Sequence, residues 1–154
     1  MAEERPALRI GVRFALSADV GSLLADARAV EAAGADSLWV DAGDADPYVL
    51  LAALAAVTWR ARLVAKARAD APGHDTCAAL ARGRLATADE LARDGERWIE
   101  APFPPSRDEW RAMRRTATDR GTAGIVVPND PRLLDLLRNP DVVDDRSDLN
   151  IATG

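Results

Sequence analysis

The sequence predicts one α/β domain in which helices cover a mainly parallel sheet, and three observations lead to this prediction. The chain has 154 residues, the size of one ordinary domain. Short apolar segments alternate with longer segments of helical periodicity along most of the chain. Residues 31–54 and 118–137 repeat one order of elements: helix, glycine, strand, Asp-Pro, helix. Such alternation is typical of right-handed βαβ units with parallel strands.

The first predicted strand covers residues 8–14, where apolar and polar side chains alternate. The helix after it has an apolar stripe at helical spacing, formed by Val20, Leu23, Leu24, Ala27 and Val30. Asp19 or Ser17 can cap the start of this helix, and Gly34 can provide its left-handed exit.

The next elements are a short apolar strand over 37–40, a helix that begins at Asp46-Pro47, and a strand over 62–65. The apolar stripe of that helix consists of Leu50, Leu51, Leu54 and Val57. Residues 69–105 are less regular. We expect a loop, a helical turn, a short strand, a helix and an extended segment, over residues 69–76, 77–81, 84–87, 88–95 and 98–101.

An irregular proline-rich segment near 102–105 follows, inside the single domain that we expect over residues 1–154. Ser106 and Glu109 then form a capping box for a helix that stops at Gly121. Residues 124–127 are a strand. Asp130-Pro131 begins the last helix, which Asn139-Pro140 ends, and the tail from residue 141 on is acidic and then mildly apolar.

Composition excludes several classes of partner. The net charge is −5 and no basic stripe is visible, so we expect no nucleic-acid binding. No apolar run approaches the roughly 20 residues that a membrane helix needs. The N-terminus lacks the apolar core of a signal peptide, and the single cysteine, Cys77, excludes an internal disulfide. We therefore expect a cytoplasmic protein.

The segments of the first half resemble a known family. The strand IGVRF, the helix and strand ARAVEAAGADSLWV, and the segment DPYVLLAALAAVTWRARLVA occur in this order within residues 8–65. This order is similar to the N-terminal part of the bacterial luciferase-like monooxygenases, which are flavin- and deazaflavin-dependent (β/α)8 barrels. RGRL at 82–85 resembles the later GRL strand of the family, and residues 124–140 look like a strand and helix from the far end of the barrel.

The chain departs from this family in length and in one segment. A full barrel typically needs about 250 residues. Where the family has a glycine-rich stretch, this chain has ATADELARDGERW at 86–98. We therefore expect an incomplete or reduced TIM-type (β/α) barrel with mainly parallel strands. Such a barrel leaves a sheet edge and an apolar face to cover, so we expect a homo-oligomer, most simply a dimer.

The resemblance implies FMN or a deazaflavin bound at the carboxyl ends of the strands, where barrels place their functional loops. The residues that we expect near this cofactor are Arg13, Asp41, Lys66 and Asn129. Arg13 and Lys66, the only lysine of the chain, could bind a phosphate or another anion. The alternative is surface charge or an ion pair with Asp41 or Asp44, and we favour it.

Other polar residues have structural explanations. Asp41 and Asp44 could share a proton or bind a hard cation, but aspartate is also common in loops. Asp46 and Asp130 are expected as helix caps. We expect His74 in an exposed turn, and Cys77 as a small buried residue rather than a nucleophile. No metal site is expected.

Two functions are consistent with the sequence. The first is a shortened luciferase-like oxidoreductase that binds FMN or a deazaflavin, and the resemblance favours it. The second is a non-catalytic relative, a dimeric scaffold or partner-binding module that has lost the cofactor site. The missing glycine-rich segment and the lack of a well-placed histidine favour this second function.

Overall fold

The computed structural model of the chain describes residues 6–43 and 45–142, so Asp44 and the acidic tail beyond residue 142 lie outside the described residues. In the described residues, six strands and six helices alternate: β1 (Arg9–Phe14), α1 (Val20–Ala32), β2 (Ser37–Asp41), α2 (Pro47–Val57), β3 (Arg62–Lys66), α3 (His74–Ala81), β4 (Leu85–Thr87), α4 (Ala88–Arg93), β5 (Trp98–Glu100), α5 (Arg107–Asp119), β6 (Gly124–Pro128) and α6 (Leu133–Arg138).

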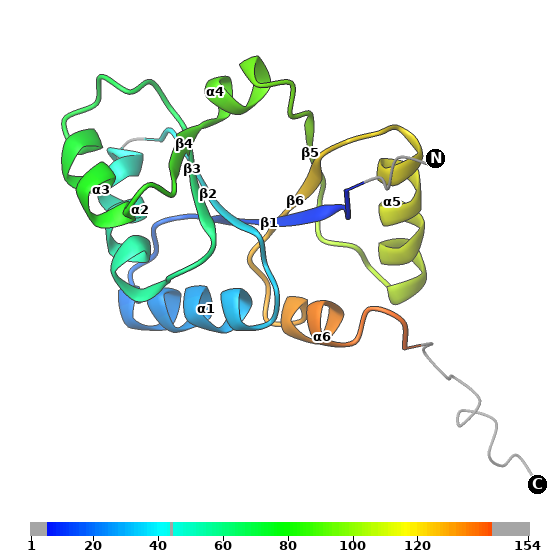
Figure 1. The fold of residues 1–154 in the computed structure, drawn as a ribbon. Helices are drawn as coiled ribbons and strands as arrows, with labels where there is room; N and C mark the ends of the chain where they lie inside the picture. The colour runs from blue at the N-terminus through cyan, green and yellow to red at the C-terminus, as the bar shows by residue number, and fades with distance from the viewer. Residues whose placement is uncertain (1–5, 44, 143–154) are drawn as a thin grey trace, which may run out of the picture.

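The strands form one parallel sheet in the order β4-β3-β2-β1-β6-β5, curled into a half-barrel (Figure 1). The last strand, β6, pairs with β1, as the last and first strands do in a closed barrel. β4 and β5 follow each other in the chain, yet they form the two opposite edges of the sheet. The predicted α/β class and the incomplete TIM-type barrel are therefore confirmed, and the opening lies between β4 and β5.

The convex face of the sheet is the main hydrophobic core. Val12 of β1, Leu38 of β2, Leu63 of β3 and Ile125 of β6 are at most 1% exposed there. Helices α1, α2, α3, α5 and α6 cover this face (Figure 1). Full burial of one such side chain stabilises the fold by roughly 1.5–3 kcal/mol.

The concave face has a second, smaller core that the chain closes by itself. Trp39 of β2, Val64 of β3 and Val126 of β6 pack there against Leu91 of α4. Figure 1 shows α4 on the open side of the curled sheet, between β4 and β5 and apart from the other helices. Helix α4 thus occupies the opening that strands would close in a complete barrel.

Two glycines make room for the tryptophans of this inner core. A Cβ atom on Gly11 of β1 would lie 2.5 Å from Nε1 of Trp39, and one on Gly124 of β6 would lie 2.2 Å from Cζ3 of Trp98. Real Cβ contacts are not this short. The Trp39 indole therefore lies over Gly11 of β1, and the Trp98 indole lies over Gly124 of β6. The centroids of the two rings are 5.3 Å apart.

Local signals explain why the chain enters and leaves α4. Thr87 accepts a hydrogen bond from the backbone N–H of Glu90, and the Glu90 carboxylate accepts one from the N–H of Thr87. Gly95, with φ of +82°, turns the chain toward β5. The capping box joins the last residue of the predicted 84–87 strand to the predicted 88–95 helix.

The turn between α2 and β3 is held by two buried or half-buried charges. The Glu31 carboxylate of α1 accepts hydrogen bonds from the backbone N–H groups of residues 59, 60 and 61. The Arg84 guanidinium donates to the carbonyls of residues 55, 58, 61 and 81 and to the Thr58 hydroxyl. These bonds satisfy backbone groups at the end of α2.

Two expectations about helix starts are wrong. The helical turn expected over 77–81 is a longer helix that begins at His74, so this histidine is not in an exposed turn; its ring packs edge-on against Tyr48. Helix α6 begins at Leu133 and its N-cap is Arg132, so Asp130 is not the helix cap that we expected; it accepts from the Arg132 N–H in the turn before the helix. In the described residues, no helix has both the length and the apolar character needed to cross a membrane.

Candidate functional site

The carboxyl ends of four strands bring charged side chains together on the concave side of the half-barrel. Val12, Val40, Ala65 and Ile99 pack on the convex core. Because side chains alternate along a strand, their neighbours Arg13, Asp41, Lys66 and Glu100 face the other side. We call these four residues the mouth cluster.

Ion pairs connect the whole mouth cluster. Lys66 Nζ lies 2.6 Å from Oε1 of Glu100 and 3.5 Å from Oδ1 of Asp41. Arg13 Nη1 lies 3.5 Å from the other oxygen of Glu100. Two cations face two carboxylates, so the formal charge of the cluster is zero. The hydrogen bond with Glu100 raises the pKa of Lys66 against the opposing effect of burial, and Asp41 adds to this rise.

The structure brings together three of the four residues that we expected near a cofactor. Arg13, Asp41 and Lys66 belong to the mouth cluster. Lys66 makes the ion pair with Asp41 that the sequence left open, whereas Arg13 pairs with Glu100 instead. Asn129 is not part of it. Its side-chain amide donates to Asp26 of α1 at 2.9 Å, and its backbone N–H donates to the Arg13 carbonyl.

Glu100 is the mouth residue that the sequence prediction missed. Residues 98–101 were expected to be extended, and period-two alternation from Trp98 would have placed Glu100 on the concave side.

A groove of about 510 Å³ begins at the mouth cluster and runs between β5 and α4. Trp39 and Trp98 line it from the sheet, and Ala88 and Ala92 line it from α4. Lys66 and Glu100 stand at its mouth end. This groove follows the edge of the sheet that β5 forms.

The far end of the groove contains a second set of ion pairs. Glu96 lies 3.0 Å from Arg9 and 3.1 Å from Arg62, and it accepts a hydrogen bond from Nε1 of Trp98. Burial opposes ionisation of Glu96, but these donors outweigh burial and lower its pKa. The inner core therefore lies between two charged layers.

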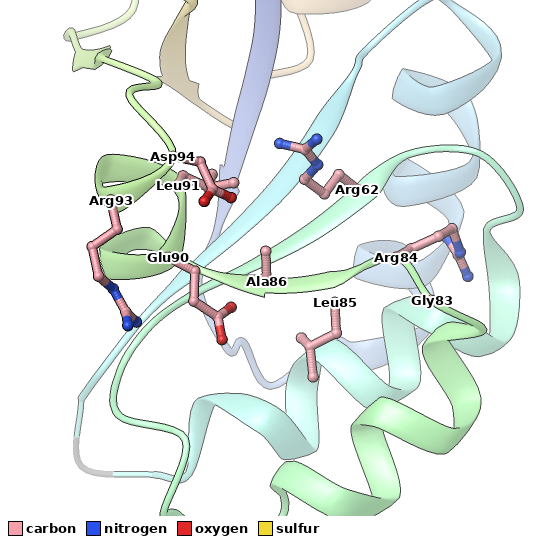
Figure 2. A pocket seen from close by; sticks show the side chains of 9 residues that line it. All are labelled: Arg62, Gly83, Arg84, Leu85, Ala86, Glu90, Leu91, Arg93 and Asp94. Atoms are coloured by element: carbon pink, nitrogen blue, oxygen red, sulfur yellow. The ribbon is translucent and has the colours of Figure 1, made fainter.

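A second cavity, of about 380 Å³, lies on the other side of α4, along the β4 edge (Figure 2). Figure 2 shows Glu90 of α4 pointing toward β4, whereas Arg84 points away from α4. The Arg84 donors are used by backbone carbonyls and Thr58. Helix α4 thus has one groove on each side, and each groove follows one edge of the sheet.

The remaining candidates have structural partners. Asp46 caps α2 through the N–H of Tyr48 and also accepts from the N–H of Gly73. Hydrogen bonds from Arg132 lower the pKa of Asp130 to about 2. Burial raises the pKa of Cys77 to about 11, which keeps it a thiol. Within the described ranges, no three His, Cys, Asp or Glu residues could hold a metal ion.

The loops after β5 and β6 are where barrels commonly bind phosphate, through backbone N–H groups and helix N-termini. Here these loops, with the end of β6, contain Pro102, Pro104, Pro105, Pro128 and Pro131, which have no N–H. The first turn of α5 carries Asp108 and Glu109. Arg132 pairs with Asp130 and lies over the Phe103 ring. These residues do not fit the phosphate of FMN.

A scan against models of known protein families finds no match, and a search of curated proteins finds no match either. The resemblance to the luciferase-like family therefore depends on the residues quoted above and on the barrel-like fold.

Proposed function

We propose that this chain is a non-catalytic relative of the luciferase-like barrels that has lost the cofactor site and acts as a binding module. The observation that carries this proposal is the self-paired mouth cluster. Barrel enzymes place their chemistry at the carboxyl ends of the strands. At that place, Arg13 and Lys66 are neutralised by Asp41 and Glu100.

The proline-rich loops support the same proposal. FMN carries a phosphate, and its binding needs unpaired cations or backbone N–H donors. The prolines after β5 and β6 remove such donors, and the acidic residues at the start of α5 repel an anion. The shortened barrel would therefore bind a cofactor phosphate poorly.

The second candidate is the shortened flavin- or deazaflavin-dependent oxidoreductase, and one observation favours it. The groove beside the mouth cluster has room for a planar ring system and is lined by Trp39 and Trp98. The groove could accept the ring of such a cofactor, but the loops after β5 and β6 offer its phosphate no comparable site.

Titration with FMN and with an oxidised deazaflavin cofactor separates the two candidates. The non-catalytic proposal predicts no saturable change in cofactor absorbance or fluorescence at tens of micromolar. Saturable binding of either cofactor at those concentrations would refute the proposal.

Asp41→Asn supplies a control for the electrostatic argument. This variant changes the formal charge of the mouth cluster from zero to +1 and leaves the two tryptophans in place. We expect it to bind FMN more tightly than the natural chain. An affinity equal to that of the natural chain would show that charge pairing is not what disfavours the phosphate.

We also propose that two copies of the chain associate. What supports association is the pair of sheet edges at β4 and β5, which expose backbone hydrogen-bonding groups. Each edge strand has three residues, so the dimer should be weak and should dissociate on dilution. Light scattering over a range of concentrations tests this, and a constant mass of 16.5 kDa at every concentration would refute it.

A further inference from the structure

We propose that the groove between β5 and α4 binds a phosphate-free, nucleobase-like heterocycle, a flat ring with a hydrogen-bond acceptor beside an N–H donor. The inference rests on the proposed function, because it names the ligand class of a binding module without a cofactor. The narrow shape of the groove and the Lys66 and Glu100 side chains at its mouth end support this ligand class.

The walls of the groove suit a flat ring. Ala88 and Ala92 are four residues apart on α4, so both present a methyl group on the same face of the helix. Trp98, together with Trp39, lines the opposite side. The Arg9 guanidinium lies over the Trp98 ring, 5.1 Å from its centroid, so a ligand ring in the groove would stack against the side that Arg9 does not cover.

The mouth end of the groove offers a donor beside an acceptor. Lys66 has three N–H donors and two carboxylate partners among the described residues, so one donor remains for a ligand. Each carboxylate oxygen of Glu100 has two lone pairs, and one ion pair to each is present in the described residues. An oxopurine matches this pair: its carbonyl accepts from Lys66, and its ring N–H donates to Glu100.

The charges at the mouth end of the groove favour a neutral ring. Glu100 belongs to the mouth cluster there, whereas Glu96 at the far end is paired with Arg9 and Arg62. The mouth cluster has no net charge. This neutral end favours an uncharged ring, and the proline-rich loops beside it lack backbone N–H donors that a nucleotide phosphate could use.

Isothermal titration calorimetry of the full chain with inosine and with 1-methylinosine tests the proposal. The methyl group of the second probe replaces the N–H that would donate to Glu100. We expect a Kd for inosine on the order of 100 µM, from the usual binding energy per ligand atom. We expect 1-methylinosine to bind at least about tenfold more weakly, because a hydrogen bond to a charged group is lost.

Two matched variants test the location. Ala92→Leu fills the groove from an exposed position of α4, so it should abolish inosine binding without disturbing the fold. Ala25→Leu makes the same change at an exposed position of α1, away from the groove, and should bind as the natural chain does. Circular dichroism of both variants shows that they fold.

The outcomes distinguish this inference from the proposed function. Failure of the folded chain to bind inosine, equal binding of both probes, or full binding by the Ala92→Leu variant would overturn the inference. If FMN also fails to bind, the non-catalytic proposal still stands. Tight binding of FMN would overturn the proposed function instead.

Discussion

Leu91 gives the sharpest test of how this half-barrel is stabilised. It is 4% exposed and packs with Trp39, Val64 and Val126 on the concave face. Truncation to alanine removes three buried carbon atoms and leaves a cavity in a small core. Leucine-to-alanine changes at such positions lower the free energy of unfolding by about 2–5 kcal/mol, so we expect Leu91→Ala to lower it by about 3 kcal/mol.

Urea denaturation followed by circular dichroism measures this cost. A protein of this size loses roughly 2–4 °C of Tm per kcal/mol, so the expected cost corresponds to a fall of about 6–12 °C.

Leu80 is the matched control on the convex side of the molecule. It is a leucine of helix α3 that is 44% exposed. Leu80→Ala should cost no more than about 1 kcal/mol, since it leaves no buried cavity. If Leu91→Ala destabilises the protein no more than Leu80→Ala does, α4 does not close the concave face and the reasoning is wrong.

Three further predictions follow from single positions. Gly124→Ala should lower the free energy of unfolding by about 1–3 kcal/mol, because its Cβ would lie 2.2 Å from the Trp98 ring. In the control Gly21→Ala, the new Cβ would lie 3.5 Å from the nearest atom, so this change should leave the Tm unchanged or raise it. Burial opposes ionisation of Glu31, but backbone N–H donors outweigh it and lower its pKa below 4.5. The Glu31 carboxylate therefore stabilises the fold above pH 4.5, and this stability is lost as pH falls through the lower folded pKa. Glu31→Gln should thus be less stable than the natural chain at pH 7, with a smaller difference near pH 3; a pH-independent difference in urea melts would contradict this. Cys77, buried and with a pKa of about 11, should react with a thiol reagent at pH 8 only as fast as the protein unfolds, and rapid labelling of the folded chain would contradict its burial.

The fold and the mouth could be predicted because both depend on local patterns. Alternation of side chains and the parallel arrangement were enough to bring Arg13, Asp41 and Lys66 to one end of the sheet. Asn129 could not be placed in this way. It follows the strand, so its side chain is directed by a partner on another element, Asp26, rather than by the period of the strand.

The position of α4 could not be predicted from its own sequence. Leu91 is its one buried residue, and three of its other five residues, Asp89, Glu90 and Arg93, are charged, so the sequence indicates a solvent-exposed helix. Only the tertiary structure shows that this leucine faces an inner core. The positions of Trp39 and Trp98 could not be predicted from their own strands either, because they depend on Gly11 and Gly124 in neighbouring strands.

The inner core also changes the argument for a dimer. We expected association because an incomplete barrel would expose an apolar face, but Leu91, Trp39 and their neighbours cover that face within one chain. What remains for a partner is the backbone of β4 and β5, three residues at each edge. Short edge strands are a common way of limiting association between sheets. If copies pair through these edges, the fold should therefore persist when the pair dissociates, and the stability lost in Leu91→Ala should not depend on protein concentration.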